Sequence, residues 1–79
     1  MVDKSVADLS ADLFMDAKLL GIEGLVKEMF AVMKPDYVPF WFYTAHDAFN
    51  GRTPYELCRD GDTEPLKRML YYLSSGTPS

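Results

Sequence analysis

Residues 50–54 read Asn-Gly-Arg-Thr-Pro, and this run constrains the fold most because it ends one helix and begins another. Asparagine and glycine both tolerate positive φ, which suits a turn that stops a helix. Thr53 can cap the next helix, Pro54 suits its first position, and Glu56 can complete a capping box. We therefore expect a sharp helix-to-helix turn with Arg52 at its apex.

Two amphipathic helices are expected before this turn. The first is capped by Asp8 or Ser10 and stops at Gly21. The second runs from about Gly24 to Met33 and ends at a Lys-Pro pair, since the residue before proline avoids helical geometry. Their apolar residues recur every three or four positions. The expected inward residues are Leu9, Leu13, Ala17 and Leu20 in the first helix and Ile22, Leu25, Val26, Met29, Phe30 and Met33 in the second.

An aromatic segment, Asp-Tyr-Val-Pro-Phe-Trp-Phe-Tyr, follows the second helix and has the composition of a strand. No partner strand is expected elsewhere, and Pro39 would remove a hydrogen bond from a strand ladder. We predict instead a short helix with Pro39 in its first turn, anchored in the core by Trp41 and Phe40. Thr44 and Asp47 have the spacing of another capping box before one further turn.

Two more helices are predicted in the last third of the chain. A helix of little more than one turn covers residues 54–59 and buries Leu57 and Cys58. After a turn, Asp62 or Thr63 caps the final helix, which ends before the polar tail. The apolar face of that helix carries Leu66, Met69, Leu70 and Leu73.

The length and composition favour a single domain over residues 1–79, an all-α bundle of about four to six short helices. A chain of 79 residues buries a modest share of its surface. Hydrophobic residues nevertheless make up 48% of the chain, so we expect apolar surface that is left to bury against a partner.

Several classes of function are disfavoured. A net charge of −4 opposes nucleic-acid binding, and no apolar run is long enough to span a membrane. A catalytic pair of His46 and Cys58 would need a pocket and an oxyanion site that nothing in the sequence indicates. Asp60 and Asp62 lack the further oxygen ligands of a calcium loop. We expect a cytoplasmic, non-enzymatic protein that needs no cofactor or metal.

A series of landmarks extends over residues 24–76 at characteristic spacing. They are Trp41, Asn50, Gly51, Thr53, Pro54, Leu57 and Gly61. This order resembles the toxin-binding domain of the Xre/MbcA/ParS-type antitoxins, in which a tryptophan precedes a Gly-Arg-Thr-Pro turn, an apolar helix, a glycine turn and a last helix. Ala45 and His46 stand where that family usually has proline and asparagine.

The resemblance implies a partner, a RES-domain toxin that consumes NAD. In that family the antitoxin packs beside the active-site entrance of the toxin, with its last helix and tail contributing. The partner-binding residues implied here are Arg52, Lys67, Arg68, Tyr71, Tyr72, Ser75 and Gly76. About two dozen residues precede the match, so we expect no helix-turn-helix domain and no operator binding through this chain.

Other interpretations stay open at this point. Arg52 could tie down its own turn by bonding local carbonyls, and it could do so while also touching a partner. Tyr71 and Tyr72 could pack at the boundary of the core. The alternative function is a stand-alone helical adaptor that homodimerises through apolar helix faces, of which the stripe from Ile22 to Met33 is the clearest.

Overall fold

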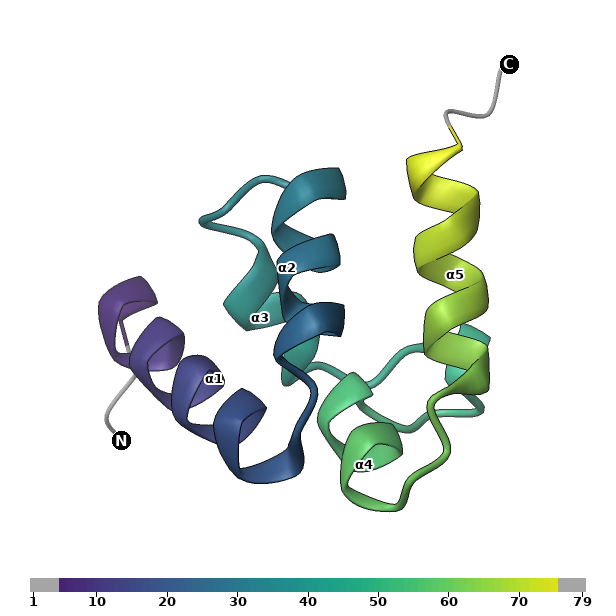
Figure 1. The fold of residues 1–79 in the computed structure, drawn as a ribbon, viewed down its shortest axis with the longest axis horizontal. Coiled ribbons are helices and arrows are strands. Elements are labelled where there is room, and N and C mark those ends of the chain that lie inside the picture. The colour runs from purple at the N-terminus through teal and green to yellow at the C-terminus, as the bar shows by residue number, and fades with distance from the viewer. Residues whose placement is uncertain (1–4, 76–79) are drawn as a thin grey trace.

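The structure, a computed structural model, describes residues 5–75, which form five α-helices and one 3₁₀ helix and no strand (Figure 1). The predicted all-α fold is therefore confirmed. The elements are α1 (Val6–Leu20), α2 (Glu23–Val32), α3 (Val38–Phe42), η1 (Asp47–Phe49), α4 (Pro54–Arg59) and α5 (Glu64–Ser74). None of the helices in this range is long and apolar enough to cross a membrane.

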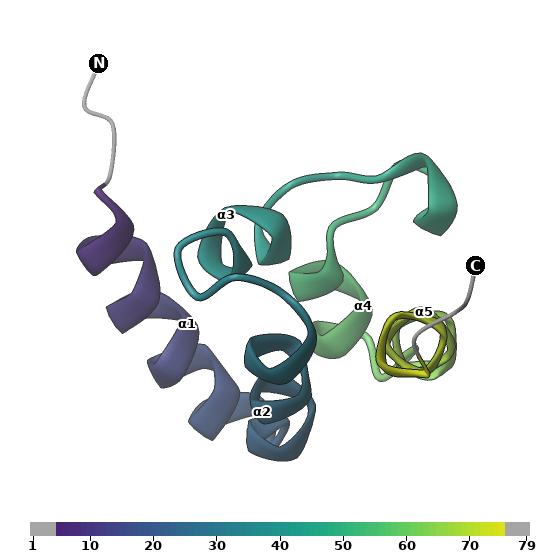
Figure 2. The ribbon, with the colours of Figure 1, turned by 90° about the horizontal axis from the view of Figure 1, so that it is seen from above.

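The helices surround one cluster of buried side chains. Helix α1 packs on α2 and α3, α2 packs on α5, and α3 packs on α4. Figure 2 shows α1 and α5 on opposite sides of the molecule, with the other α-helices between them. The cluster contains Leu13, Ala17, Ile22, Val26, Met29, Val38, Trp41, Phe42, Phe49, Leu57, Cys58, Leu66 and Leu70. Helices α1 and α5 therefore form the two ends of the bundle.

The start of α1 corrects the predicted cap. Ser5 caps the helix, because its Oγ accepts a hydrogen bond from the backbone N–H of Asp8 at 3.2 Å. Asp8 is instead the acidic residue of the first turn, where a negative charge suits the helix dipole. Gly21 ends the helix with φ of 71°, as predicted.

Helix α3 confirms the choice of a helix over a strand but corrects one of its anchors. Trp41 is buried as predicted, whereas Phe40 is 42% exposed and Phe42 is fully buried. Residues three and four apart share one side of a helix, so Val38, Trp41 and Phe42 face the core together. Phe40 lies on the other side.

The inward face of α5 is shorter than predicted. Leu66 and Leu70 are buried, but Leu73 on the same side is 47% exposed. Because all three share one helical face, the difference lies in position along the axis. The core ends before the last turn of α5.

A matched pair of substitutions in α3 tests the corrected anchor. Phe42→Ala is expected to lower the free energy of unfolding by about 3–5 kcal/mol, because it leaves a cavity in the core. Phe40→Ala removes the same side chain from a half-exposed position and is expected to cost less than about 1 kcal/mol. Urea unfolding followed by circular dichroism measures both. Equal losses for the two variants would contradict this packing.

Candidate functional site

The predicted turn at residues 50–54 is present and is closed by backbone hydrogen bonds. Asn50 and Gly51 adopt φ of 58° and 80°, which ends η1 as the sequence indicated. The N–H of His46 donates to the carbonyl of Arg52 at 3.1 Å, and the N–H of Gly51 donates to the carbonyl of His46 at 3.0 Å. These hydrogen bonds close the segment from His46 to Arg52 into a loop, and the two residues lie side by side at its base.

The segment before this turn lacks the second capping box that was predicted. His46 is the N-cap of η1 and makes no side-chain capping bond. The hydroxyl of Thr44 donates to the carbonyl of Phe40 instead of reaching forward to η1. The Thr44 hydroxyl thus bonds a carbonyl of α3. It is therefore not available to cap the first turn of η1.

His46 belongs to an aromatic cluster. Its Nε2 donates to the carbonyl of Trp41 at 3.0 Å, and its ring lies 5.2 Å from the indole ring between centroids. The ring of Phe49 lies 6.2 Å from Trp41 and 5.8 Å from His46. The three rings fix the loop onto α3, so His46 has a packing role here.

Helix α4 begins and ends where the sequence predicted. Thr53 accepts from the N–H of Glu56 at 3.0 Å, and the Glu56 carboxylate accepts from the N–H of Thr53 at 2.9 Å. Leu57 and Cys58 are buried, as expected. Burial raises the pKa of the Cys58 thiol to about 11, which keeps it protonated and a poor nucleophile near neutral pH.

Arg52 binds two carboxylates, whereas bonding to local carbonyls was one of the roles that the sequence left open. Its Nη2 lies 2.5 Å from Oδ2 of Asp60, and its Nη1 lies 3.2 Å from Oδ2 of Asp62. The two aspartates flank Gly61, which adopts φ of 76°. The acidic pair that faintly resembled a calcium loop is thus occupied by arginine. In the described part of the chain, no group of three metal-binding side chains is present.

The carboxylate of Asp60 has a second basic neighbour. Arg59 Nε donates to Oδ1 of Asp60 at 3.2 Å. The hydrogen bond from Arg59, followed by the attraction of Arg59 and Arg52, holds the pKa of Asp60 below its ordinary value. Both arginines therefore favour the charged form of this side chain.

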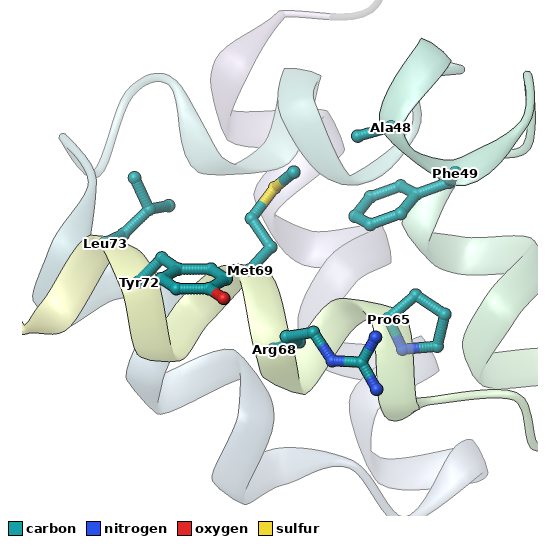
Figure 3. A pocket seen from close by; sticks show the side chains of 7 residues that line it. All are labelled: Ala48, Phe49, Pro65, Arg68, Met69, Tyr72 and Leu73. Carbon is teal, nitrogen blue, oxygen red and sulfur yellow. The ribbon is translucent and has the colours of Figure 1, made fainter.

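A groove lies between η1 and α5, with a volume of about 370 Å³. We call it the η1–α5 groove; its walls are Ala48, Phe49, Pro65, Arg68, Met69, Tyr72 and Leu73 (Figure 3). All but two of these side chains are apolar. The exceptions are the Arg68 guanidinium and the Tyr72 hydroxyl. The groove can therefore hold an apolar side chain and offer a cation beside it.

A second groove lies on the other side of α5. We call it the α2–α5 groove; it is lined by Leu25, Glu28, Ala31, Val32, Lys67, Tyr71 and Ser74. The predicted partner-binding residues are thus divided between the two grooves. Tyr71 and Tyr72 are 68% and 64% exposed, so neither packs at the boundary of the core. Ser75 directly follows α5, and Gly76 lies outside the described residues.

Arg52 is not brought together with the two tyrosines. Its partner Asp62 precedes the start of α5, whereas Tyr71 lies seven residues into that helix, about 10 Å along its axis. Lys67 and Arg68 lie between these two levels. The residues of α5 that were predicted to bind a partner therefore form two rows on different sides of the helix, Lys67 with Tyr71 and Arg68 with Tyr72, and Arg52 lies apart from both.

Some surface residues were not anticipated from the sequence. The walls of the η1–α5 groove include Ala48 and Pro65, which come from separate elements and share no sequence pattern. The outward side of α1 exposes Phe14, Met15 and Leu19, although their apolar spacing could have drawn attention to them.

Comparisons with protein-family models, with curated proteins and with solved structures found no match.

The environment of Asp60 generates a prediction about pH. Because its pKa is lowered in the folded chain, the charged carboxylate stabilises the fold above the ordinary aspartate pKa of about 4, and this contribution is lost as pH falls through the lower folded value. Arg59→Gln is expected to raise the pKa of Asp60 towards the ordinary value, and Arg52→Gln to raise it less. An NMR titration of the Asp60 carboxyl measures this.

Lys67→Gln provides the matched control for these variants. It also removes one positive charge, but from a residue that the structure places in the α2–α5 groove. The pKa of Asp60 should stay unchanged in that variant. An Asp60 pKa that is insensitive to both arginines would contradict the geometry.

Proposed function

We propose that this chain is a protein-interaction module that neutralises a RES-type toxin by laying α5 beside the active-site entrance of the toxin. The observation that carries the proposal is the exposed end of α5. Tyr71, Tyr72 and Leu73 are all uncovered there, next to the cation of Arg68. Tyrosine and arginine are enriched among residues that dominate binding energy, because they combine a large contact area with directed polar groups.

The η1–α5 groove supports a definite kind of contact. Its apolar walls suit an inserted apolar side chain of the partner, and Arg68 at its edge suits a carboxylate beside that side chain. Tyr72 combines both kinds of contact, because its ring is apolar like the walls of the groove and its hydroxyl is polar. The groove would be covered on binding, and its aromatic wall would then contribute most of the affinity.

Inhibition in this proposal is steric and involves no chemistry by the chain itself. The identity of the partner rests on the resemblance carried by Trp41 and by residues 51–54. We assign Arg52 a positioning role, because its guanidinium already binds Asp60 and Asp62. In that role it fixes the start of α5 and so the direction in which the helix presents its aromatic end.

Tyr72→Ala tests the proposed contact. We expect it to raise the Kd for a RES-domain toxin at least about tenfold, or about 1.4 kcal/mol, because an exposed aromatic anchor is lost. Titration calorimetry with purified RES-domain toxins measures Kd, and growth on co-expression measures neutralisation. Arg68→Gln should weaken binding as well, and its effect should shrink at high salt.

Tyr37→Ala is the matched control, since Tyr37 is also an exposed tyrosine, at 52%, but lies at the start of α3. It should leave Kd unchanged. Two results would contradict the proposal: no binding of the unaltered chain to any RES-domain toxin tested, or equal losses for the two tyrosine variants.

A further inference from the structure

Helix α1 is apolar on two opposite sides. Leu13 and Ala17 face the core, while Phe14, Met15 and Leu19 are 57%, 64% and 77% exposed. A helix on the surface of a monomer ordinarily turns polar residues outward. The exposure of these three side chains is therefore unusual, and Leu19 exceeds every other large apolar residue described as exposed.

Phe14 borders a hollow between α1 and α2, whereas Met15 lines a separate hollow with Tyr43. The ring of Phe14 stacks on that of Phe30, with centroids 5.6 Å apart and planes 7° from parallel. The hollow has a volume of about 240 Å³ and is lined by Phe14, Ala17, Glu23, Val26, Lys27 and Phe30. Apart from one acid and one base, its lining is apolar. We call this hollow, together with Met15 and Leu19, the α1 face.

We propose that the α1 face binds the α1 face of a second copy of this chain, which gives a two-fold symmetric dimer. In such a dimer, if residue i contacts residue j of the other copy, then j contacts i in return. Glu23 and Lys27 are four residues apart on α2, so they lie on one side of it. A two-fold axis between them places Glu23 of each copy against Lys27 of the other.

The charges of the α1 face favour a second copy over an unrelated partner. A partner of one sign would match either Glu23 or Lys27 and repel the other, whereas the chain itself supplies both signs at the matching spacing. Within residues 5–75 neither side chain forms an ion pair, so both are available for an intermolecular one. The same contact would cover Phe14, Met15 and Leu19.

This seam shares part of the α2 stripe that the sequence suggested as a dimer surface. Ile22 and Met29 lie in the core, whereas Val26 and Phe30 line the hollow of the α1 face. Helices α1 and α5 lie on opposite sides of the molecule (Figures 1 and 2). Dimerisation would therefore leave both α5 surfaces free, and it does not depend on the toxin-binding proposal.

A charge-reversal cycle tests the dimer by sedimentation equilibrium of the purified full chain. We expect the unaltered chain, of 9.0 kDa, to show a concentration-dependent mass that approaches twice that value. Glu23→Lys and Lys27→Glu should each raise the dimer Kd about tenfold, because each sets like charges against one another. The double variant restores opposite charges and should return Kd to near its original value.

Leu19→Asp provides an independent test, because it places an unpaired charge among the apolar side chains that the seam would cover. It should give a monomer, while Tyr72→Asp, a matched change at an exposed residue of α5, should leave the dimer intact. Circular dichroism confirms that each variant is folded. A monomeric mass for the unaltered chain up to about 1 mM would overturn the proposal. A dimer that Tyr72→Asp dissociates and Leu19→Asp does not would also overturn it.

Discussion

The contact of Arg52 with Asp60 and Asp62 is a side-chain link between the turn after η1 and the turn before α5. The first of these turns is already fixed, because His46 bonds both the backbone of Arg52 and the carbonyl of Trp41. A continuous series of contacts therefore connects the buried side chain of Trp41, by way of His46 and Arg52, to the turn that precedes α5.

This contact sets geometry more than it supplies stability. The side chains of Arg52, Asp60 and Asp62 are 35%, 44% and 52% exposed, and ion pairs at such positions contribute little to the free energy of folding. The stability comes from the buried cluster, in which Phe42 is the largest fully buried side chain. The small core and the polar contacts thus have separate roles. The core holds the helices together, and the polar contacts set the orientation of α5.

The exposed apolar surface follows from the size of the chain. A domain of this length has too little interior for all of its apolar residues. Most of the surplus in the described part of the chain lies in two places, at the end of α5 and along the outer side of α1, while Tyr37 and Phe40 are exposed at α3. Because these places are on opposite sides, each can meet a different partner, and we have proposed a toxin for one and a second copy for the other.

Local chemistry made much of this structure predictable. The positive φ of Asn50 and Gly51 and the capping box of Thr53 and Glu56 depend only on neighbouring residues, and so the bounds of α4 were predicted correctly. The choice of Phe42 over Phe40 depends on how α3 is rotated against the other helices. A five-residue helix has too little periodicity to show that.

Long-range contacts account for the other differences. Eight and ten residues separate Arg52 from its two carboxylates, so only the packed chain reveals the pairing. The η1–α5 groove likewise joins residues from two elements. The exposed tyrosines were predicted as contact candidates from a resemblance, and their division between two grooves required the structure.

Hydrogen exchange of the chain, free and bound to a RES-domain toxin, tests most directly whether α5 is the contact surface. Backbone amides over residues 68–75 should exchange more slowly in the complex, because α5 is then covered. Amides over residues 50–62 should keep the rates they have in the free chain, since that region is already held by Arg52 and its aspartates. Slowed exchange over residues 50–62, with unchanged exchange in α5, would contradict the proposed binding mode.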